Sequence, residues 1–531
     1  MMLPKTRLHP SLKLLILVPF ASAGLVTFCI NSATAIGAEK KIISTSKSAH
    51  ESSGTTSTAN LKKNVSLEEL VSGAISGSVT AQKIKTALAN ARIIDLQSKA
   101  PFEIQTFSTL SYSNSAKDSL SPNAADTTQT SAATLGASKY FDTGTTVTGS
   151  FTLNQTDLSF SPPVPGREVG GSMLSFSVEQ NLLKDGFGKS SRLKSKGATH
   201  SAKAVGYNVA DRLEEYAVSI SDLFFNTKKS QLGYRAAKES EKEQRKLLKI
   251  AKLLRQRGVT EKSDLLEVET SYIKATETSK DALTRLENTW NTSILLLGLD
   301  KIYKSVPPME IILEFEDRTP WAKSVCKEPS KAGVKKAAKF KAMSENLESA
   351  NASFEASKED ASPELSLSFT HENENFDEEL SQATADSLTN EGQANTVALN
   401  FSMPIGGSAL KAAVFDAARD KKSFELEVNN FVADSITEIE NECNTLERTE
   451  RKIRTLAGVL DKQSERARLD MDRFTVGRLD AFKAIQSSIA VSSARFELEA
   501  AKMDLAATIW RLLKLTGEMT EIFSAQTQGA P

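Results

Sequence analysis

The sequence predicts an α+β membrane protein, in which long helices form a coiled-coil-like barrel and short strands contribute to a transmembrane β-barrel shared by several chains. Three observations predict this class: a secretory N-terminus, an internal repeat, and a change from alternating to helical periodicity within each repeat. The chain has 531 residues, of which 40% are hydrophobic and only 6% aromatic. Basic and acidic residues are balanced at 66 each, so nucleic acid is not an expected partner, because neutralising phosphates normally requires a basic excess.

The N-terminus has the order of a secretory signal peptide. Basic residues precede an apolar run from Leu14 to Ile30, and the small residues Ala33–Ala35 follow it. We therefore expect residues 1–38 to be a signal peptide and residues 39–64 to be a flexible lead-in rich in Ser, Thr and Lys. The alternative for the apolar run is a membrane anchor, since it approaches the ~20 residues that a spanning helix needs.

Cysteine and histidine give no indication of catalysis. Outside the signal peptide only Cys326 and Cys443 occur, and their separation in the sequence indicates neither a disulfide framework nor a Cys-rich metal site. The four histidines have no spacing that suits a metal site or a catalytic triad. We predict no catalytic, cofactor or metal site, and hence a protein that is not an enzyme.

Two halves of the chain match each other at a constant offset of 219 residues. Gly188, Gly258 and Gly298 align with Gly407, Gly477 and Gly517, since 407 − 188, 477 − 258 and 517 − 298 all equal 219. A match of this kind constrains the architecture more than local propensity does. We expect a first repeat at 65–298, a linker or equatorial segment at 299–330, a second repeat at 331–517 and a flexible tail at 518–531.

Each repeat contains a long helical hairpin. No proline interrupts either helical region, and apolar residues recur at steps of three and four. A helix over Lys189–Gln256 would be on the order of 100 Å long at about 1.5 Å per residue. The chain then reverses at Arg257–Thr260 and continues as a helix over Lys262–Leu297, and the second copy reverses at Thr475–Arg478. The apolar stripes are narrow, so the hairpins need neighbours, either the other repeat or other subunits in a ring.

Alternating periodicity before each hairpin predicts strands. Leu174, Phe176 and Val178 alternate with polar residues, as do the apolar residues from Val397 to Met403. Their predicted partner strands are Phe102–Ser113 and Leu365–Thr370. The alternative is a small soluble β-subdomain. Two strands per copy leave open edges in one chain, and open edges cannot sit in lipid, so we expect several chains to close one barrel.

The first copy contains one further hairpin. Leu135–Tyr140 and Thr145–Leu153 alternate on either side of Asp142–Gly144, and the second copy has no equivalent. The sequence leaves open whether this hairpin joins the barrel.

Together these features resemble the TolC-like outer membrane efflux protein family, the outer-membrane factor of tripartite export systems. The likeness covers roughly Val65 to Gly517 and depends on the order of the motifs, each of which is weak alone. The matching pieces are Ser66–Leu70, Pro101, Pro363, Phe401–Ile405, Arg257–Val259 with Asp264, Val476–Arg478, Leu297-Gly298 and Leu515–Gly517.

The resemblance implies a homotrimer in the outer membrane with a helical tunnel in the periplasm. Such a protein is a passive exit channel of a tripartite efflux or type I protein secretion system, and it takes no cofactor. Its partners would be a periplasmic adaptor, an inner-membrane transporter and outer-membrane lipid. The alternative is a periplasmic coiled-coil structural or adaptor protein without a pore.

The resemblance also suggests functional residues at the tip of the hairpins. The residues expected to contact the adaptor are Arg257, Gly258, Val259, Thr260, Thr475, Val476, Gly477 and Arg478. The residues expected at the periplasmic gate are Asp264, Glu267, Lys483 and Gln486. The gate departs from the family pattern, because Lys483 stands where an acid is common. We expect Asp264 to pair with Arg478 or Lys483 in the closed state; the alternative is a solvated acid at a helix start.

Overall fold

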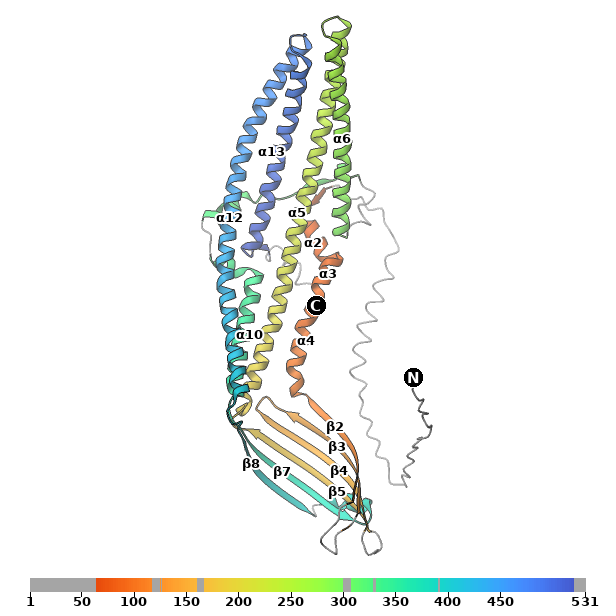
Figure 1. The fold of residues 1–531 in the computed structure, drawn as a ribbon, viewed down its shortest axis with the longest axis vertical. Coiled ribbons are helices and arrows are strands. Elements are labelled where there is room, and N and C mark those ends of the chain that lie inside the picture. Colours follow the sequence, from red (N-terminus) through yellow and green to blue (C-terminus); the bar gives the residue numbers. More distant parts are fainter. Residues whose placement is uncertain are drawn as a thin grey trace, which may run out of the picture.

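The computed structural model describes residues 64–116, 125, 127–159, 167–298, 307–327, 331–389 and 392–519. The predicted signal peptide, nearly all of the lead-in and nearly all of the tail lie outside these residues. The molecule is elongated, with long helices at one end and a β-sheet at the other (Figure 1). None of the helices in the described residues is long and apolar enough to cross a membrane.

Four long helices make two hairpins that follow the repeat. Helix α5 (Lys189–Gln256) and helix α12 (Ser408–Thr475) each have 68 residues, and α6 (Lys262–Leu296) and α13 (Ala481–Leu515) each have 35. The starts of α5 and α12 differ by 408 − 189 = 219, and those of α6 and α13 by 481 − 262 = 219. The predicted hairpins are therefore confirmed, with α6 ending one residue before the predicted Leu297.

The two hairpins pack through α5 and α13, which lie side by side (Figure 1). A ladder of ion pairs crosses this contact on its exposed side. It comprises Arg495–Glu239, Lys229–Asp504, Arg511–Asp222 at 3.3 Å and Lys514–Glu215 at 3.0 Å. Exposed pairs of this kind contribute little stability each, so the buried apolar residues between the helices hold the hairpins together.

Shorter elements pack against the long helices and the sheet. They are β1 (Asn64–Ser66), α2 (Leu67–Gly77), α3 (Val79–Thr86), α4 (Leu88–Lys99), η2 (Ala100–Phe102), η3 (Gly186–Gly188), η4 (Pro308–Glu310), β6 (Ile312–Glu314), α8 (Thr319–Lys327), α9 (Lys331–Lys336), α10 (Ala338–Asp360) and α11 (Leu380–Ser387). Strand β1 pairs in parallel with β6. Helix α2 begins at an N-cap, because the Ser66 hydroxyl accepts a hydrogen bond from the Glu69 amide at 3.1 Å. Helix α10 packs along α5 through alanines, and Gly197 of α5 faces Ala352 there.

The sheet has six strands in one continuous ladder. Their order is β2 (Ile104–Ala116), β3 (Thr127–Tyr140), β4 (Thr145–Ser159), β5 (Arg167–Asn181), β7 (Glu364–Asp377) and β8 (Gln393–Ser402). Every neighbouring pair is antiparallel. The four strands predicted from alternation are all present. The additional hairpin of the first copy forms β3 and β4, which lie inside the sheet between β2 and β5.

The two faces of the sheet differ in chemistry, because residues paired across antiparallel strands point to the same side. One row on what we call the apolar face, taken across all six strands, is Ile104, Lys139, Val147, Val178, Phe369 and Val397. The adjacent row on what we call the hydroxyl face is Gln105, Ser138, Thr148, Ser177, Thr370 and Thr396. The side chains of the apolar face are largely uncovered, with Leu110 83% and Val397 70% exposed.

The structure corrects the expectation for cysteine. Cys326 of α8 and Cys443 of α12 form a disulfide, with their Cα atoms 5.5 Å apart and a sequence separation of 117. It adjoins a buried cluster in which Ala322 of α8 packs on Ile439 and Leu446 of α12. The linker crosses α12 at this point, and that tertiary contact is what brings two distant cysteines together.

Candidate functional site at the helical tip

Both hairpins turn through the same backbone motif. Gly258 has φ of 75° and Gly477 has φ of 71°. At the first turn the Gly258 amide donates to the Arg255 carbonyl and the Val259 amide donates to the Leu254 carbonyl, both at 3.0 Å. The second turn makes the equivalent bonds at 2.9 Å. This is the Schellman arrangement, in which a left-handed glycine satisfies the last carbonyl groups of a helix.

The two turns pack on one another, which the sequence did not predict. A Cβ atom placed on Gly477 would collide with Cγ1 of Val259, whereas a Cβ on Gly258 would meet nothing within 4 Å. Beneath the turns a buried cluster joins all four long helices through Leu247, Ala251, Leu254, Val268, Phe474, Ala481, Ala484 and Ile485. The tips of the two repeats therefore form a single unit in one chain.

The residues expected to contact an adaptor are exposed on this unit, except that Thr260 is half-buried. Val259 is 53% exposed and Val476 62% exposed, so each turn presents an apolar side chain to solvent. Two basic residues, Arg257 and Arg478, lie beside them. Exposed apolar side chains beside arginines are typical of surfaces that contact another protein.

The four expected gate residues occupy equivalent places in the first turns of α6 and α13. Asp264 is half-buried, while Glu267, Lys483 and Gln486 are exposed. Lys483 lies 3.6 Å from Asp480, the N-cap residue of its own helix. Within the described residues of the single chain, no ion pair joins Asp264 to Arg478 or Lys483. That pairing stays a prediction for contacts between chains.

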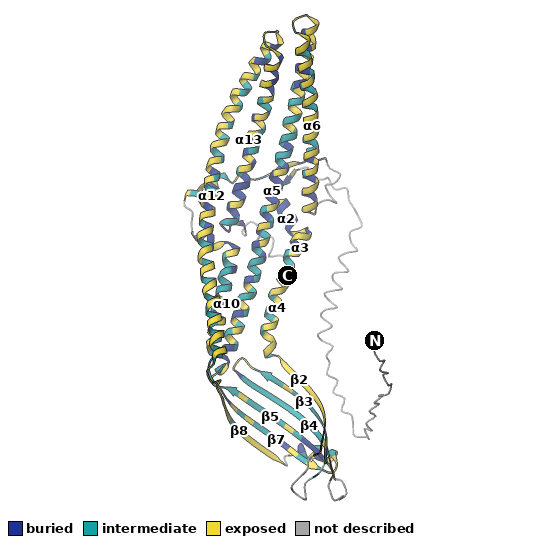
Figure 2. Cartoon of the chain, viewed as in Figure 1, coloured by how far each residue is buried: buried dark blue, intermediate teal, exposed yellow. Residues whose placement is uncertain are grey.

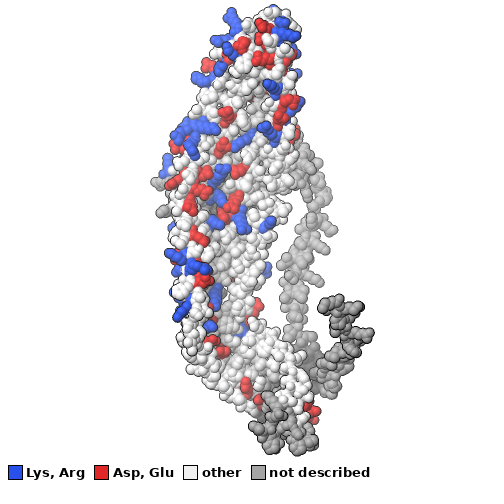
Figure 3. Space-filling model, viewed as in Figure 1, with Lys and Arg blue, Asp and Glu red and all other residues white. Residues whose placement is uncertain are grey.

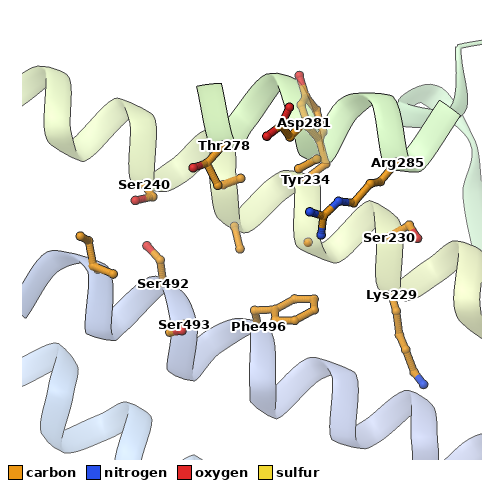
Figure 4. Close-up of a pocket in the computed structure, with 15 residues that line it drawn as sticks. Lys229, Ser230, Tyr234, Ser240, Thr278, Asp281, Arg285, Ser492, Ser493 and Phe496 are labelled. Atoms are coloured by element: carbon orange, nitrogen blue, oxygen red, sulfur yellow. The ribbon is translucent and has the colours of Figure 1, made fainter. Parts of the chain in front are cut away.

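A groove lies between the hairpins, between the tip cluster and the centre of the molecule. It has a volume of about 570 Å³ and is lined by small residues of α5 and α13, with Tyr234, Arg285 and Phe496 at its sides (Figure 4). Within the described residues no group of three or more His, Cys, Asp or Glu could hold a metal ion.

The strand-to-helix bend before α5, which we call the elbow (Asp185–Gly188), has an unusual backbone and its own hydrogen bonds. Asp185 and Phe187 both have left-handed backbones, with φ of 49° and 51°. The Asp185 carboxylate accepts hydrogen bonds from the Ser191 amide at 2.9 Å and from the Tyr140 hydroxyl. Burial alone would raise the pKa of Asp185, but hydrogen bonds from Ser191 and Tyr140 outweigh it and lower the pKa.

Comparison with solved structures places the fold among outer-membrane channels. Over 85% of its length the chain superposes on the outer-membrane channel OprN (14% identity, 89% of that chain, TM-score 0.62), and on CusC, which forms a transmembrane channel (14% identity, 92% of that chain, TM-score 0.64). It also superposes on the outer membrane protein VceC from Vibrio cholerae (12% identity, 96% of that chain, TM-score 0.62). By sequence, no family profile and no curated protein matches the chain.

At sequence identities of 12–14%, the superposition on these structures establishes the fold. The chain has the fold of these outer-membrane channels, and the TolC-like resemblance predicted from its sequence is confirmed at the level of the fold.

Proposed function

We propose that the protein is the outer-membrane exit channel of a tripartite efflux or type I protein secretion system. In this proposal three copies close a β-barrel in the outer membrane and a helical tunnel through the periplasm. The conduit is passive, and an inner-membrane transporter supplies energy through a periplasmic adaptor that contacts the helical tip.

The sheet is the observation that carries this proposal. Its apolar face is largely uncovered, its other face is lined with hydroxyl groups, and the outer edges of strands β2 and β8 are unpaired within the described residues. In a membrane barrel the apolar face would be buried in lipid and the hydroxyl groups would face water. The unpaired edges would pair with those of other copies.

Charge distribution supports the same arrangement. Lys, Arg, Asp and Glu crowd the helical part in the view of Figure 3, whereas the sheet shows few of them. Charged side chains are costly at the lipid face of a membrane barrel. The helical part instead carries many charged side chains, and exposed residues run along both hairpins (Figure 2). This is expected for walls that face water or other copies.

The length of the helices supports a periplasmic tunnel. Helix α5 has 68 residues, which corresponds to about 100 Å at about 1.5 Å per residue. A rigid duct of this length would reach well into the periplasm from the outer membrane. The tip would then meet the adaptor far from the bilayer.

The test is single-channel conductance of the purified mature protein in planar bilayers, with its oligomer size measured in the same detergent. We expect discrete conductance steps from a trimer. A protein that is soluble and monomeric without detergent would refute the proposal and favour a periplasmic coiled-coil spacer or adaptor without a pore.

A further inference from the structure

We propose that the barrel formed by this chain has eighteen strands and a correspondingly wide mouth, because its inserted hairpin β3–β4 forms part of the barrel wall. This inference rests on the proposed trimeric channel. Three copies of the six-stranded sheet give 3 × 6 = 18 strands, whereas two strands per repeat would give twelve.

The insertion is visible in the sequence as a difference between the repeats. Pro101 and Gly188 are 188 − 101 = 87 residues apart, but Pro363 and Gly407 are only 407 − 363 = 44 apart. The difference is 87 − 44 = 43 residues. This length suffices for two strands and their turns, since β3 has 14 residues and β4 has 15.

The inserted strands are paired along their whole length. The ladder between β2 and β3 runs from Ile104↔Lys139 to Ala116↔Thr127, and that between β4 and β5 runs from Thr145↔Gln180 to Leu158↔Arg167. A hairpin folded over the barrel would instead leave β2 next to β5. Removing β3 and β4 from the wall would break both ladders and expose their backbone groups, which lipid does not tolerate.

The inserted strands also continue the two faces of the sheet. On the apolar face Leu135 pairs with Phe151, which pairs with Leu174 of β5. On the hydroxyl face three pairs of hydroxyl groups join β3 to β4 at 3.0–3.2 Å: Thr130–Thr156, Thr134–Thr152 and Ser138–Thr148. The hairpin thus has one side for lipid and one for water, as a wall segment needs.

The position of the uncovered apolar residues along the strands shifts gradually from one edge of the sheet to the other. On β2 they extend to Tyr112, toward the end of the strand far from the helices, whereas on β8 they run from Val397 to Phe401, toward the helices. Strands tilted in a bilayer show this diagonal band. Leu135 of the inserted strand β3, which is 62% exposed, lies within the same band.

The turn of the inserted hairpin is fastened to the elbow before α5. The Asn181 amide donates to the Gly144 carbonyl at 3.0 Å, and Arg192 Nη1 donates to the Asp142 carbonyl at 2.8 Å. A Cβ atom on Gly188 would collide with that same carbonyl oxygen, so glycine is needed for the close approach. The equivalent Gly407 has only the Pro404 carbonyl nearby, at 3.9 Å. The conformation of the elbow before α5 therefore depends on contact with the turn of the inserted hairpin.

The edges of the sheet have the directions that closure requires. Strand β2 leads away from the helices and β8 leads back to them (Figure 1). Strand β8 of one copy would lie antiparallel to β2 of the next, so closure keeps every neighbour antiparallel. With strands about 4.7 Å apart and tilted about 40°, the backbone radius would be about 18 Å for eighteen strands and about 12 Å for twelve.

Thiol labelling tests the wall assignment in the full mature chain. We choose the neighbouring pairs Thr134→Cys with Leu135→Cys on β3, and Thr152→Cys with Phe151→Cys on β4. The two native cysteines outside the signal peptide form a disulfide and do not compete. In a conducting trimer we expect a membrane-impermeant thiol reagent to modify the two threonine positions and spare the two apolar ones. Equal reactivity within each pair would overturn the inference and leave the channel in place.

Electron microscopy of the trimer and a deletion variant give two further readouts. We expect eighteen strands in the wild type. Removing residues 117–159 deletes 159 − 117 + 1 = 43 residues, including β3 and β4, and joins the end of β2 to the segment that leads into β5. We expect that variant, where it assembles, to show twelve strands and exclude polymers from its mouth at a smaller size. A wild-type trimer with twelve strands, or a dimer that closes twelve, would overturn the inference. A soluble monomer would overturn the proposed channel itself.

Discussion

Gly477 and Gly258 share a backbone conformation, but they have different surroundings. Replacing either by alanine places a Cβ on a left-handed residue, which costs about 1–2 kcal/mol. Only at Gly477 would the new Cβ also collide with Val259. We expect Gly477→Ala to destabilise the tip more than Gly258→Ala, measured as hydrogen-exchange protection of the tip amides.

A double-mutant cycle separates the collision from the backbone cost. In a Val259→Ala background, Gly477→Ala should cost about as much as Gly258→Ala, because the colliding methyl group has been removed. An unchanged cost of Gly477→Ala in both backgrounds would show that the two turns do not pack as the structure has them.

The half-buried Asp185 and the buried Asp211 should respond oppositely to neutralisation. Burial would raise the pKa of Asp185, but its hydrogen bonds lower it overall. Its charged form therefore adds stability above the pKa of the unfolded chain, and this stability is lost as pH falls through the lowered value. Asp211 on α5 is 7% exposed, and burial raises its pKa, although Lys514 and Lys339 oppose that shift. Its charged form therefore costs stability above the raised value.

We expect Asp185→Asn to lower the midpoint of thermal unfolding at about pH 7, and Asp211→Asn to leave it unchanged or raise it. As the pH falls toward about 4, the Asp211 difference should shrink first, because the raised pKa of that carboxyl group lets it become protonated. The Asp185 difference should persist until the pH falls toward the lowered pKa of that group. The measurement is thermal unfolding of both variants and the wild type across this pH range. A lower midpoint for Asp211→Asn at neutral pH would contradict the assigned cost of burying that charge.

At the scale of elements, the disulfide fastens the linker to a long helix. Cys326 and Cys443 close a loop of 117 residues between α8 and α12, and a 2.8 Å ion pair between Lys323 and Glu450 supports the same contact. Crosslinks that close long loops typically contribute about 2–4 kcal/mol. We expect Cys326→Ser with Cys443→Ser to lower the unfolding midpoint.

Reductant provides the matched control for this prediction. Reduced wild type should unfold like the double variant, whose own midpoint should not respond to reductant. Alkylation of both cysteines in unreduced, denatured wild type would show that the bond is absent and refute the prediction.

The sequence predicts those elements whose causes lie within the chain segment itself. The long helices follow from periodicity, from the absence of proline and from turn glycines such as Gly258, and their ends agree with the structure almost to the residue. The inserted hairpin was likewise predicted around Asp142–Gly144. Its place in the sheet was not, because pairing with β2 and β5 is a choice between partners distant in sequence.

The missed features depend on tertiary contacts. The pairing of Cys326 with Cys443 requires the linker to cross α12, and the short pairing of β1 with β6 joins segments 248 residues apart (312 − 64). Helix α11 covers part of the apolar face of the sheet, where the Asn373 side chain donates to the Ser387 carbonyl at 2.6 Å. None of these contacts leaves a periodic pattern in its own segment.

At the scale of the whole molecule, the tip is a region where the charges of different copies would meet in the proposed trimer. Within one chain Lys483 lies beside Asp480, and Asp264 has no partner among the ion pairs of the described residues. A ring of three copies would bring α6 of one chain toward α13 of another, and there Asp264 could pair with Arg478 or Lys483. Such a pair would hold the conduit closed until an adaptor engages the tip.

We therefore expect Asp264→Ala to raise the conductance of the reconstituted channel and to admit larger solutes, because it removes the acidic half of the closing contact. Exposed ion pairs contribute only up to about 1 kcal/mol each, so three equivalent pairs would shift the opening equilibrium by an amount that single-channel records resolve. Glu277→Ala is the control, since Glu277 lies further along α6 and pairs with Lys280 of its own helix. The contrary outcome is that Asp264→Ala matches Glu277→Ala and the wild type in both conductance and solute entry. Asp264 would then be a solvated acid at the start of a helix, and other contacts would determine closure.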